Sequence, residues 1–237
     1  MCLILPRSIW EPGELLRFLA TCNVIMFLTA LAFAPEAVNT ALNMSFFLAP
    51  STEVLFKMGA SGTVPVFSMD RWWTVITANY LHGSLVHLVF NVMSLLSVGK
   101  ITLEIYGPSR LFLVYFLGGI FAMAASSLVG IALTVGASGA VCALIGAMAY
   151  DDWRANKGNL KKRLASVGIW VVFIALIGLT LPNVNNWAHA IGFASGFLFG
   201  FCFWPNTTQK ESTLFRVIAR ICMLITIATL VYGLMFS

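Results

Sequence analysis

A serine and three histidines are the residues of this chain that could carry covalent chemistry. Ser138 stands in the small-residue run GASGAV, and the three histidines are His82, His87 and His189. A serine hydroxyl becomes a nucleophile when a neighbouring base accepts its proton, and histidine is the most frequent base. Free N–H groups at the start of a helix beginning at Ser138 would stabilise a developing oxyanion. Helix packing is the alternative interpretation, because small-residue runs are common where membrane helices touch.

A second polar group lies in the run HGSLVHLVFN. His87 and Asn91 are four residues apart and therefore share one face of a helix. Together they offer two side-chain donors to one point, as an oxyanion site requires. His82 is expected to begin the same helix. A zinc site is the competing interpretation, but the sequence has no HExxH motif and these apolar stretches hold no Asp or Glu. We therefore predict no metal and no cofactor.

A stripe of glycines follows His189 in the run AHAIGFASGFLFG. Gly192, Gly196 and Gly200 recur at four-residue spacing, which lets another helix approach closely. His189 lies three residues before the first of them, near the same stripe. If the approaching helix is the one that begins at Ser138, the serine meets His189. A histidine with a purely structural role is the alternative.

Composition places these residues inside a membrane. Of the 237 residues, 59% are hydrophobic and only 10% are charged, whereas a soluble domain carries about 25% charged residues. Five stretches of 18, 28, 40, 46 and 17 residues contain no Lys, Arg, Asp or Glu. Because roughly 20 apolar residues cross a bilayer, the two longest stretches hold two crossings each. We therefore predict seven spans, near residues 15–35, 74–99, 111–130, 138–150, 164–181, 187–205 and 217–236.

The distribution of Lys and Arg predicts the orientation. With the N-terminus in the cytoplasm, all 14 of these residues except Lys57 and Arg71 fall on the inner side. The C-terminus then lies outside. The predicted organisation is a cytoplasmic N-terminus (1–14), a six-span catalytic core (15–205) with a long outer loop (36–72), a cytoplasmic loop (206–216) and an additional transmembrane helix (217–237). The net charge of +5 is thus a topology signal, and we expect the lipid bilayer, not nucleic acid, as the partner.

The fourth predicted span is too short for the bilayer. A helix from Ser138 to Tyr150 is about 20 Å long, against a hydrocarbon core of ~30 Å. Non-helical backbone below the surface is tolerated only where it lines protein or a water-filled cavity. We therefore predict a hydrated pocket that opens outward. Gly136 is placed with the oxyanion donors, and Cys142 and Asn186 are placed along the wall of the pocket.

The ordered set HGSLVHLVFN, GASG and AHxxGxxxG resembles the rhomboid family of intramembrane serine proteases. The similarity runs from about Trp72 to Gly200, and LEIYGPSR resembles the Glu-containing loop of the family. The resemblance implies an all-α polytopic membrane protein, with a rhomboid-like six-helix bundle plus a seventh C-terminal transmembrane helix. It also implies a bacterial cytoplasmic membrane as the location.

The same resemblance implies the chemistry. Ser138 and His189 would form a catalytic dyad without a third acid. His87, Asn91 and the Ser138 backbone would form the oxyanion site, with His82 in support. The substrates would be transmembrane segments of other membrane proteins, cleaved near the outer face.

Two departures from the family pattern concern single residues. Thr74 stands where many bacterial members have an arginine, and Cys142 stands where many have an aromatic residue. Two other functions compete with proteolysis. One is a catalytically inactive rhomboid-like protein that binds membrane clients, which the presence of both dyad residues disfavours. The other is a transporter with a histidine proton relay, which predicts carboxylates in the spans, and the spans have none.

Overall fold

The computed structural model describes residues 9–11, 13–35, 38–39, 47–155, 160–180, 184–204 and 211–235. Within these ranges the regular secondary structure is helical, and β pairing is limited to two isolated bridges. The helices are α1 (Glu14–Phe33), α2 (Thr52–Met58), α3 (Thr74–Thr77), α4 (Leu85–Leu128), α5 (Ser138–Ala155), α6 (Leu160–Thr180), α7 (Asn186–Cys202) and α8 (Thr213–Met235). The chain is an all-α polytopic membrane protein, as the sequence predicts.

The membrane assignment rests on helix length and composition. Three of the described helices, α1, α4 and α8, are each long and apolar enough to cross a membrane. The 44-residue α4 is two helices in one, because Gly107 breaks it with φ 77° and ψ 170°. Pro108 then starts the second half, at a position where its missing N–H costs nothing. The second and third predicted spans therefore meet at a tight turn between Gly107 and Pro108.

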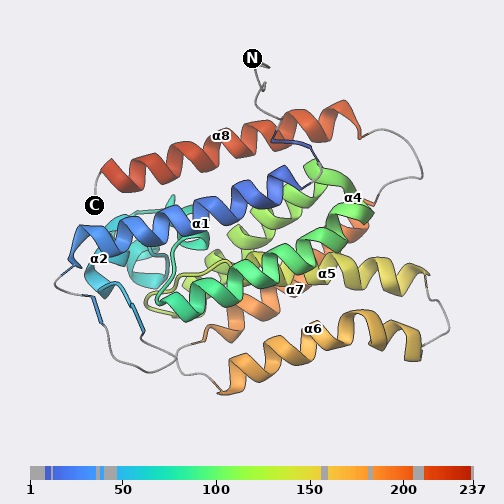
Figure 1. Cartoon of the computed structure of the whole chain (residues 1–237), viewed down its shortest axis with the longest axis horizontal. Coiled ribbons are helices and arrows are strands. Elements are labelled where there is room, and N and C mark those ends of the chain that lie inside the picture. The colour runs from blue at the N-terminus through green and yellow to red at the C-terminus, as the bar shows by residue number, and fades with distance from the viewer. Residues whose placement is uncertain are drawn as a thin grey trace, which may run out of the picture.

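The centre of the bundle is α5. Every residue from Gly139 to Met148 is buried, and α5 packs against α4, α6 and α7. Figure 1 shows α6 and α8 on opposite sides of the molecule, with α4, α5 and α7 between them. On its side, α8 contacts α4, α3 and α2. The helix that carries Ser138 at its first position is thus buried along the ten residues that follow it.

The turn inside α4 is fastened by a distant carboxylate. Glu211 accepts hydrogen bonds from the Ser109 backbone N–H at 2.8 Å and from the Ser109 hydroxyl at 2.7 Å. These bonds satisfy a free donor at the start of the second half of α4. Glu104, the glutamate in the predicted family-like loop, is exposed instead. The segment before α8 is therefore tied to the turn between two other helices.

Two boundaries differ most from the sequence prediction. The second span was expected to begin at residue 74, but α3 and a 3₁₀ turn (Ala78–Tyr80) come first and α4 begins at Leu85. The Ser84 hydroxyl caps α4 by accepting from the His87 N–H at 3.2 Å, so His82 lies outside that helix. The fourth span was expected to end at residue 150, but α5 continues to Ala155. Its last turn carries Arg154, which stacks on the Trp204 ring at 4.6 Å.

The described part of the outer loop packs onto the bundle. Arg71 donates to the carbonyl oxygens of Phe56 and Lys57, both at 2.9 Å, and so caps the end of α2. Its guanidinium also lies 4.8 Å from the centre of the Trp73 ring. Thr74 donates its hydroxyl proton to the Arg71 carbonyl at 2.7 Å. In this chain an arginine before the two tryptophans fastens the outer loop, and Thr74 supports it.

Candidate active site

The short segment before Ser138 is held in place by hydrogen bonds to other parts of the chain. Ser61 and Thr134 form an antiparallel bridge, with the Ser61 N–H donating to the Thr134 carbonyl at 3.0 Å. Two residues further on, the Gly136 N–H donates to the Ala78 carbonyl at 2.8 Å. The backbone at Gly136 has φ 126°, a conformation that side chains with a Cβ rarely adopt. The chain therefore enters α5 through a fixed turn, with Ser138 at the first helical position.

His189 lies in the first turn of α7 and faces Ser138. Its Nε2 atom is 2.8 Å from the Ser138 Oγ, and both residues are half-buried. This is the distance expected between a nucleophile and its base. The Nδ1 atom of His189 is buried and has no hydrogen-bond partner in the part of the chain that the structure describes. A dyad without a third acid therefore stays a prediction.

The glycine stripe of α7 lies against the backbone of α5. A Cβ at Gly192 would come within 3.2 Å of the Gly139 Cα, and one at Gly196 within 2.5 Å of the Ala143 Cα. One turn further along, a Cβ at Gly200 would lie 3.0 Å from the Ala147 Cα. The two helices thus touch backbone to backbone. The close approach of the two helices that carry Ser138 and His189 therefore depends on glycine at these positions.

His87 lies close to the same turn. Its Nδ1 accepts from the Gly83 N–H at 3.4 Å, which leaves the proton of a neutral ring on Nε2. A Cβ at Gly136 would lie 2.7 Å from that Nε2 atom, so the ring edge faces the segment before Ser138. His87 can therefore present an N–H donor beside the serine.

Asn91 and His82 both contact His87. The buried Asn91 donates one Nδ2 proton to the His87 carbonyl at 2.9 Å, which leaves its second N–H proton for another acceptor. The His82 ring lies edge-on to the His87 ring, with centroids 5.1 Å apart. His82 is fully buried. His82 thus packs against the His87 ring.

Two further residues were predicted to line the pocket. Cys142 is buried, with 2% of its surface exposed, one turn below Ser138 in α5. The Asn186 side chain is exposed and donates to the Gly178 carbonyl of α6 at 3.0 Å, so it is directed toward α6. The groups of three or more His, Cys, Asp or Glu that a metal ion requires do not occur in the described ranges.

The neighbouring residue, Asn185, makes the contacts that the sequence prediction missed. Its Oδ1 accepts from the Ala188 N–H at 3.0 Å and caps α7. Its Nδ2 donates to the hydroxyl oxygens of Ser126 and Thr134, at 2.8 Å and 3.0 Å. The sequence does carry a signal for the cap, because asparagine is a preferred residue directly before a helix. The two hydroxyl contacts join distant parts of the chain and leave no local pattern.

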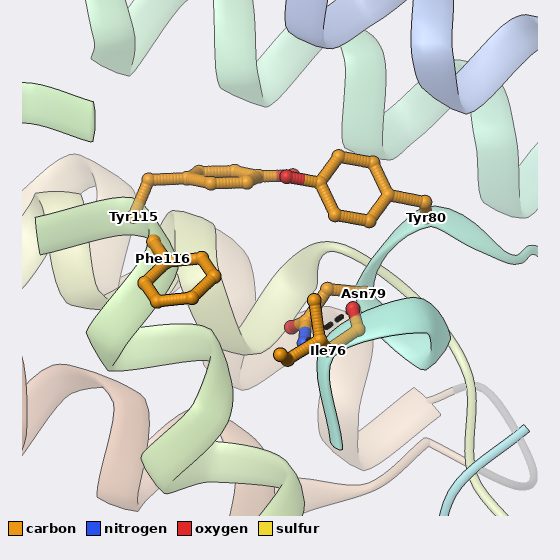
Figure 2. A pocket seen from close by; sticks show the side chains of 5 residues that line it. All are labelled: Ile76, Asn79, Tyr80, Tyr115 and Phe116. Carbon is orange, nitrogen blue, oxygen red and sulfur yellow. Dashed lines mark hydrogen bonds between the residues drawn. The ribbon is translucent and has the colours of Figure 1, made fainter. Parts of the chain in front are cut away.

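A small cavity lies away from the Ser138–His189 pair. It has a volume of about 10 Å³, near the minimum for one water molecule. Figure 2 shows the buried Tyr80 and Tyr115 hydroxyl groups pointing toward one another beside Asn79. Its lining is Ile76, Asn79, Tyr80, Tyr115 and Phe116, with none of the predicted site residues. The predicted hydrated pocket at Ser138 is a different place and stays a prediction.

The fold and the site together describe a polytopic helical membrane protein in which a serine and a histidine from two packed helices meet. Comparison with known families agrees with this class. The chain matches the Rhomboid domain family over residues 69–206, which is more than half of its length. The chain belongs to the Rhomboid family. The matched range contains α3 to α7 and all the predicted site residues, whereas α1 and α8 lie outside it.

Several known proteins are similar to the chain. RHOMBOID-like protein 1 of Arabidopsis thaliana is 35% identical over 181 residues, which are 75% of this chain and 44% of that protein. Rhomboid protease GluP of Bacillus subtilis is 32% identical over 151 residues, or 62% of this chain and 29% of GluP. Rhomboid-like protease 3 of Toxoplasma gondii is 29% identical over 199 residues, or 82% of this chain and 74% of that protein.

These relatives limit what carries over to the chain. It spans about half the length of the Arabidopsis relatives RHOMBOID-like proteins 1, 4 and 6, with 44%, 40% and 51% covered. They come from plants, a bacterium and Toxoplasma, and one is named as mitochondrial. The family membership and the apolar helices make the chain an integral multi-pass membrane protein. The expected bacterial cytoplasmic membrane stays a prediction.

Proposed function

We propose that the chain is an intramembrane serine endopeptidase that cleaves transmembrane segments of other membrane proteins with a dyad of Ser138 and His189. The observation that carries the proposal is the 2.8 Å contact between the Ser138 Oγ and the His189 Nε2. A neutral imidazole at this distance can take the hydroxyl proton as the oxygen attacks. Membership of a family that includes proteins named as proteases supports the same chemistry.

The reaction follows from the positions of the two groups. The Ser138 Oγ forms a bond to the carbonyl carbon of the scissile peptide, and its proton passes to the His189 Nε2. The imidazolium then protonates the leaving amine as the C–N bond breaks, which leaves an acyl-enzyme. A water molecule, deprotonated by the same nitrogen, attacks the ester and releases the acid. His189 ends neutral, and Ser138 regains its proton.

The oxyanion formed at each step needs donors on one side of Ser138. We assign the Nε2–H of His87 and the second Nδ2–H of Asn91 to this role. The His87 ring lies beside Gly136 in the turn that leads into α5, and Asn91 lies one helical turn after His87 and is bonded to its carbonyl. The free N–H groups of the first turn of α5 would add to them. His82 packs on the His87 ring and would hold its orientation.

The distribution of positively charged residues indicates on which side of the membrane Ser138 lies. Positively charged residues favour the cytoplasmic side, which places α2 and the start of α5 toward the outside. Cleavage would therefore occur near the outer face. A cysteine introduced by Lys57→Cys should react with a membrane-impermeant thiol reagent in intact cells, and one introduced by Arg154→Cys only after permeabilisation. The reverse pattern would invert the orientation.

The purified protein in detergent tests the proposed activity directly. It should cleave at least one member of a panel of single-span membrane proteins, and a fluorophosphonate should label it covalently. Ser138→Ala should lose both activities while it keeps the unfolding temperature of the wild type, because the change removes one oxygen from a polar site. Labelling or cleavage that persists in Ser138→Ala would place the nucleophile elsewhere.

A further inference from the structure

Asn185 joins three parts of the chain through one side chain. Its Oδ1 caps the start of α7, and its Nδ2 bonds the hydroxyl oxygens of Ser126, near the end of α4, and Thr134, in the segment before α5. Ser126 and Thr134 are both buried, with 0% and 9% of their surfaces exposed. Buried hydroxyl groups that lose a partner destabilise the protein, so these contacts constrain all three segments.

The joined segments carry the two members of the dyad. His189 lies one helical turn after Asn185, and its N–H donates to the Asn185 carbonyl at 3.3 Å. Thr134 lies four residues before Ser138 and is bridged to Ser61 on its other side, with its N–H donating to the Ser61 carbonyl at 2.6 Å. The Asn185 side chain therefore spans directly from the histidine helix to the segment that delivers the serine.

We propose that Asn185 is a positioning residue for the dyad. It fixes the first turn of α7 against the Ser138 segment and so keeps the His189 Nε2 within hydrogen-bond distance of the Ser138 Oγ. This inference rests on the proposed protease function. Asn185 does not touch the reacting atoms, and it acts through His189 and Thr134. Misplacing a catalytic group by about 1 Å can cost on the order of 10² in rate, so a loosened tie should be visible in kcat.

Substitutions at Asn185 separate its two hydrogen bonds to Ser126 and Thr134 from its role as the cap of α7. Asn185→Ser keeps a capping oxygen, because serine caps helices about as well as asparagine, but it is too short to reach both hydroxyl groups. Asn185→Asp keeps the cap and the contact with Thr134, whose hydroxyl can turn to donate to the new carboxylate oxygen. It gives up the contact with Ser126, whose hydroxyl donates to the Ala122 carbonyl. Asn185→Ala loses both functions. If Asn185 served only as a cap, the Ser and Asp variants would behave alike.

The measurements are kcat and KM for one cleaved substrate and the rate of fluorophosphonate labelling, with the unfolding temperature as a control. We expect Asn185→Ser to lose about tenfold or more in kcat with little change in KM, and Asn185→Asp to stay within about threefold of the wild type. Thr134→Val removes one acceptor from the other side and should give a similar loss. The double variant Thr134→Val with Asn185→Ser should be little worse than either single variant, because both break one interaction.

The outcomes distinguish the two proposals. Full kcat in both Asn185→Ser and Thr134→Val would overturn the positioning role. Equal losses in Asn185→Ser and Asn185→Asp would also overturn it, because the tie should survive only in the second. Cleavage that is unchanged in Ser138→Ala would instead overturn the Ser138–His189 dyad, and a wild type that cleaves no substrate of the panel would overturn the protease function itself, whatever the Asn185 variants do.

Discussion

Gly196→Ala tests whether the contact between α5 and α7 sets the dyad. A Cβ at Gly196 would lie 2.5 Å from both the Cα and the carbonyl carbon of Ala143, and the carbonyl oxygen would be closer still. Ordinary contact begins at 3.4 Å, so the backbones must separate by at least 0.9 Å. Because α5 carries Ser138 and α7 carries His189, the same movement would lengthen their 2.8 Å hydrogen bond to about 3.7 Å.

The expected losses follow from this separation. A displacement of about 1 Å in a catalytic group costs on the order of 10² in rate, so turnover should fall roughly a hundredfold. Forcing an extra methyl group into a tight helix contact should also lower the free energy of unfolding by about 1–3 kcal/mol. The assay is cleavage of one single-span substrate by purified protein, together with fluorophosphonate labelling of Ser138. Both should fall in parallel, because both need the activated serine.

Gly99→Ala is the matched control, since it makes the same change in another membrane helix. A Cβ there would meet only the end of the Leu16 side chain, with the Cδ2 atom at 2.5 Å. A leucine side chain can rotate away, whereas a helix backbone cannot. Gly99→Ala should therefore keep wild-type turnover. If Gly196→Ala were as active as Gly99→Ala, the backbone contact would not control the distance between Ser138 and His189.

Three further changes test single contacts. Asn91→Ala should lower kcat by about 10²–10³ with a smaller effect on KM, as loss of one oxyanion donor does, and an unchanged kcat would remove Asn91 from that role. Gly136→Ala should abolish turnover, because φ there is 126° and the new Cβ would lie 2.7 Å from the His87 ring. Full activity of this variant would show that turnover does not depend on the position of the His87 ring. Glu211→Ala should lower the free energy of unfolding by about 1–2 kcal/mol, because it removes two hydrogen bonds to Ser109. Glu211→Gln keeps an acceptor and should lower it less. If both variants were as stable as the wild type, the two bonds would not hold the turn in α4.

Much of the fold could be predicted from the sequence because membrane spans depend on local composition. Charge-free stretches and the bilayer thickness give the number and order of the long apolar helices without knowledge of their packing, but not the short helices α2 and α3. The glycine spacing in α7 predicts a close helix partner, and the structure shows α5 in that place. The Ser138 Oγ lies 2.8 Å from the His189 Nε2, while the catalytic roles of the two residues remain predictions.

The remaining contacts depend on residues far apart in the sequence. Arg71 caps α2, Glu211 bonds the turn in α4, and Asn185 joins α7 to two other segments. Each is a polar residue in a loop or at a helix end, where hydropathy has no periodic signal. The prediction of one helix over residues 74–99 also missed the break between Tyr80 and Leu85, for a different reason. The capping signal of Ser84 lies within an apolar stretch that reads as one continuous span.

The glycine contact between α5 and α7 has a consequence for membranes of different thickness. Membrane helices adapt to a thinner or thicker bilayer mainly by tilting, at a modest cost per ångström. Helices with large exposed apolar faces, such as α8 and α6, can tilt against lipid, whereas α5 is buried from Gly139 to Met148 and is locked to α7 by backbone contact. A change in lipid length should therefore move the outer helices around an unchanged Ser138–His189 pair. Lipid composition would then act on the approach of a membrane substrate and not on the distance between nucleophile and base.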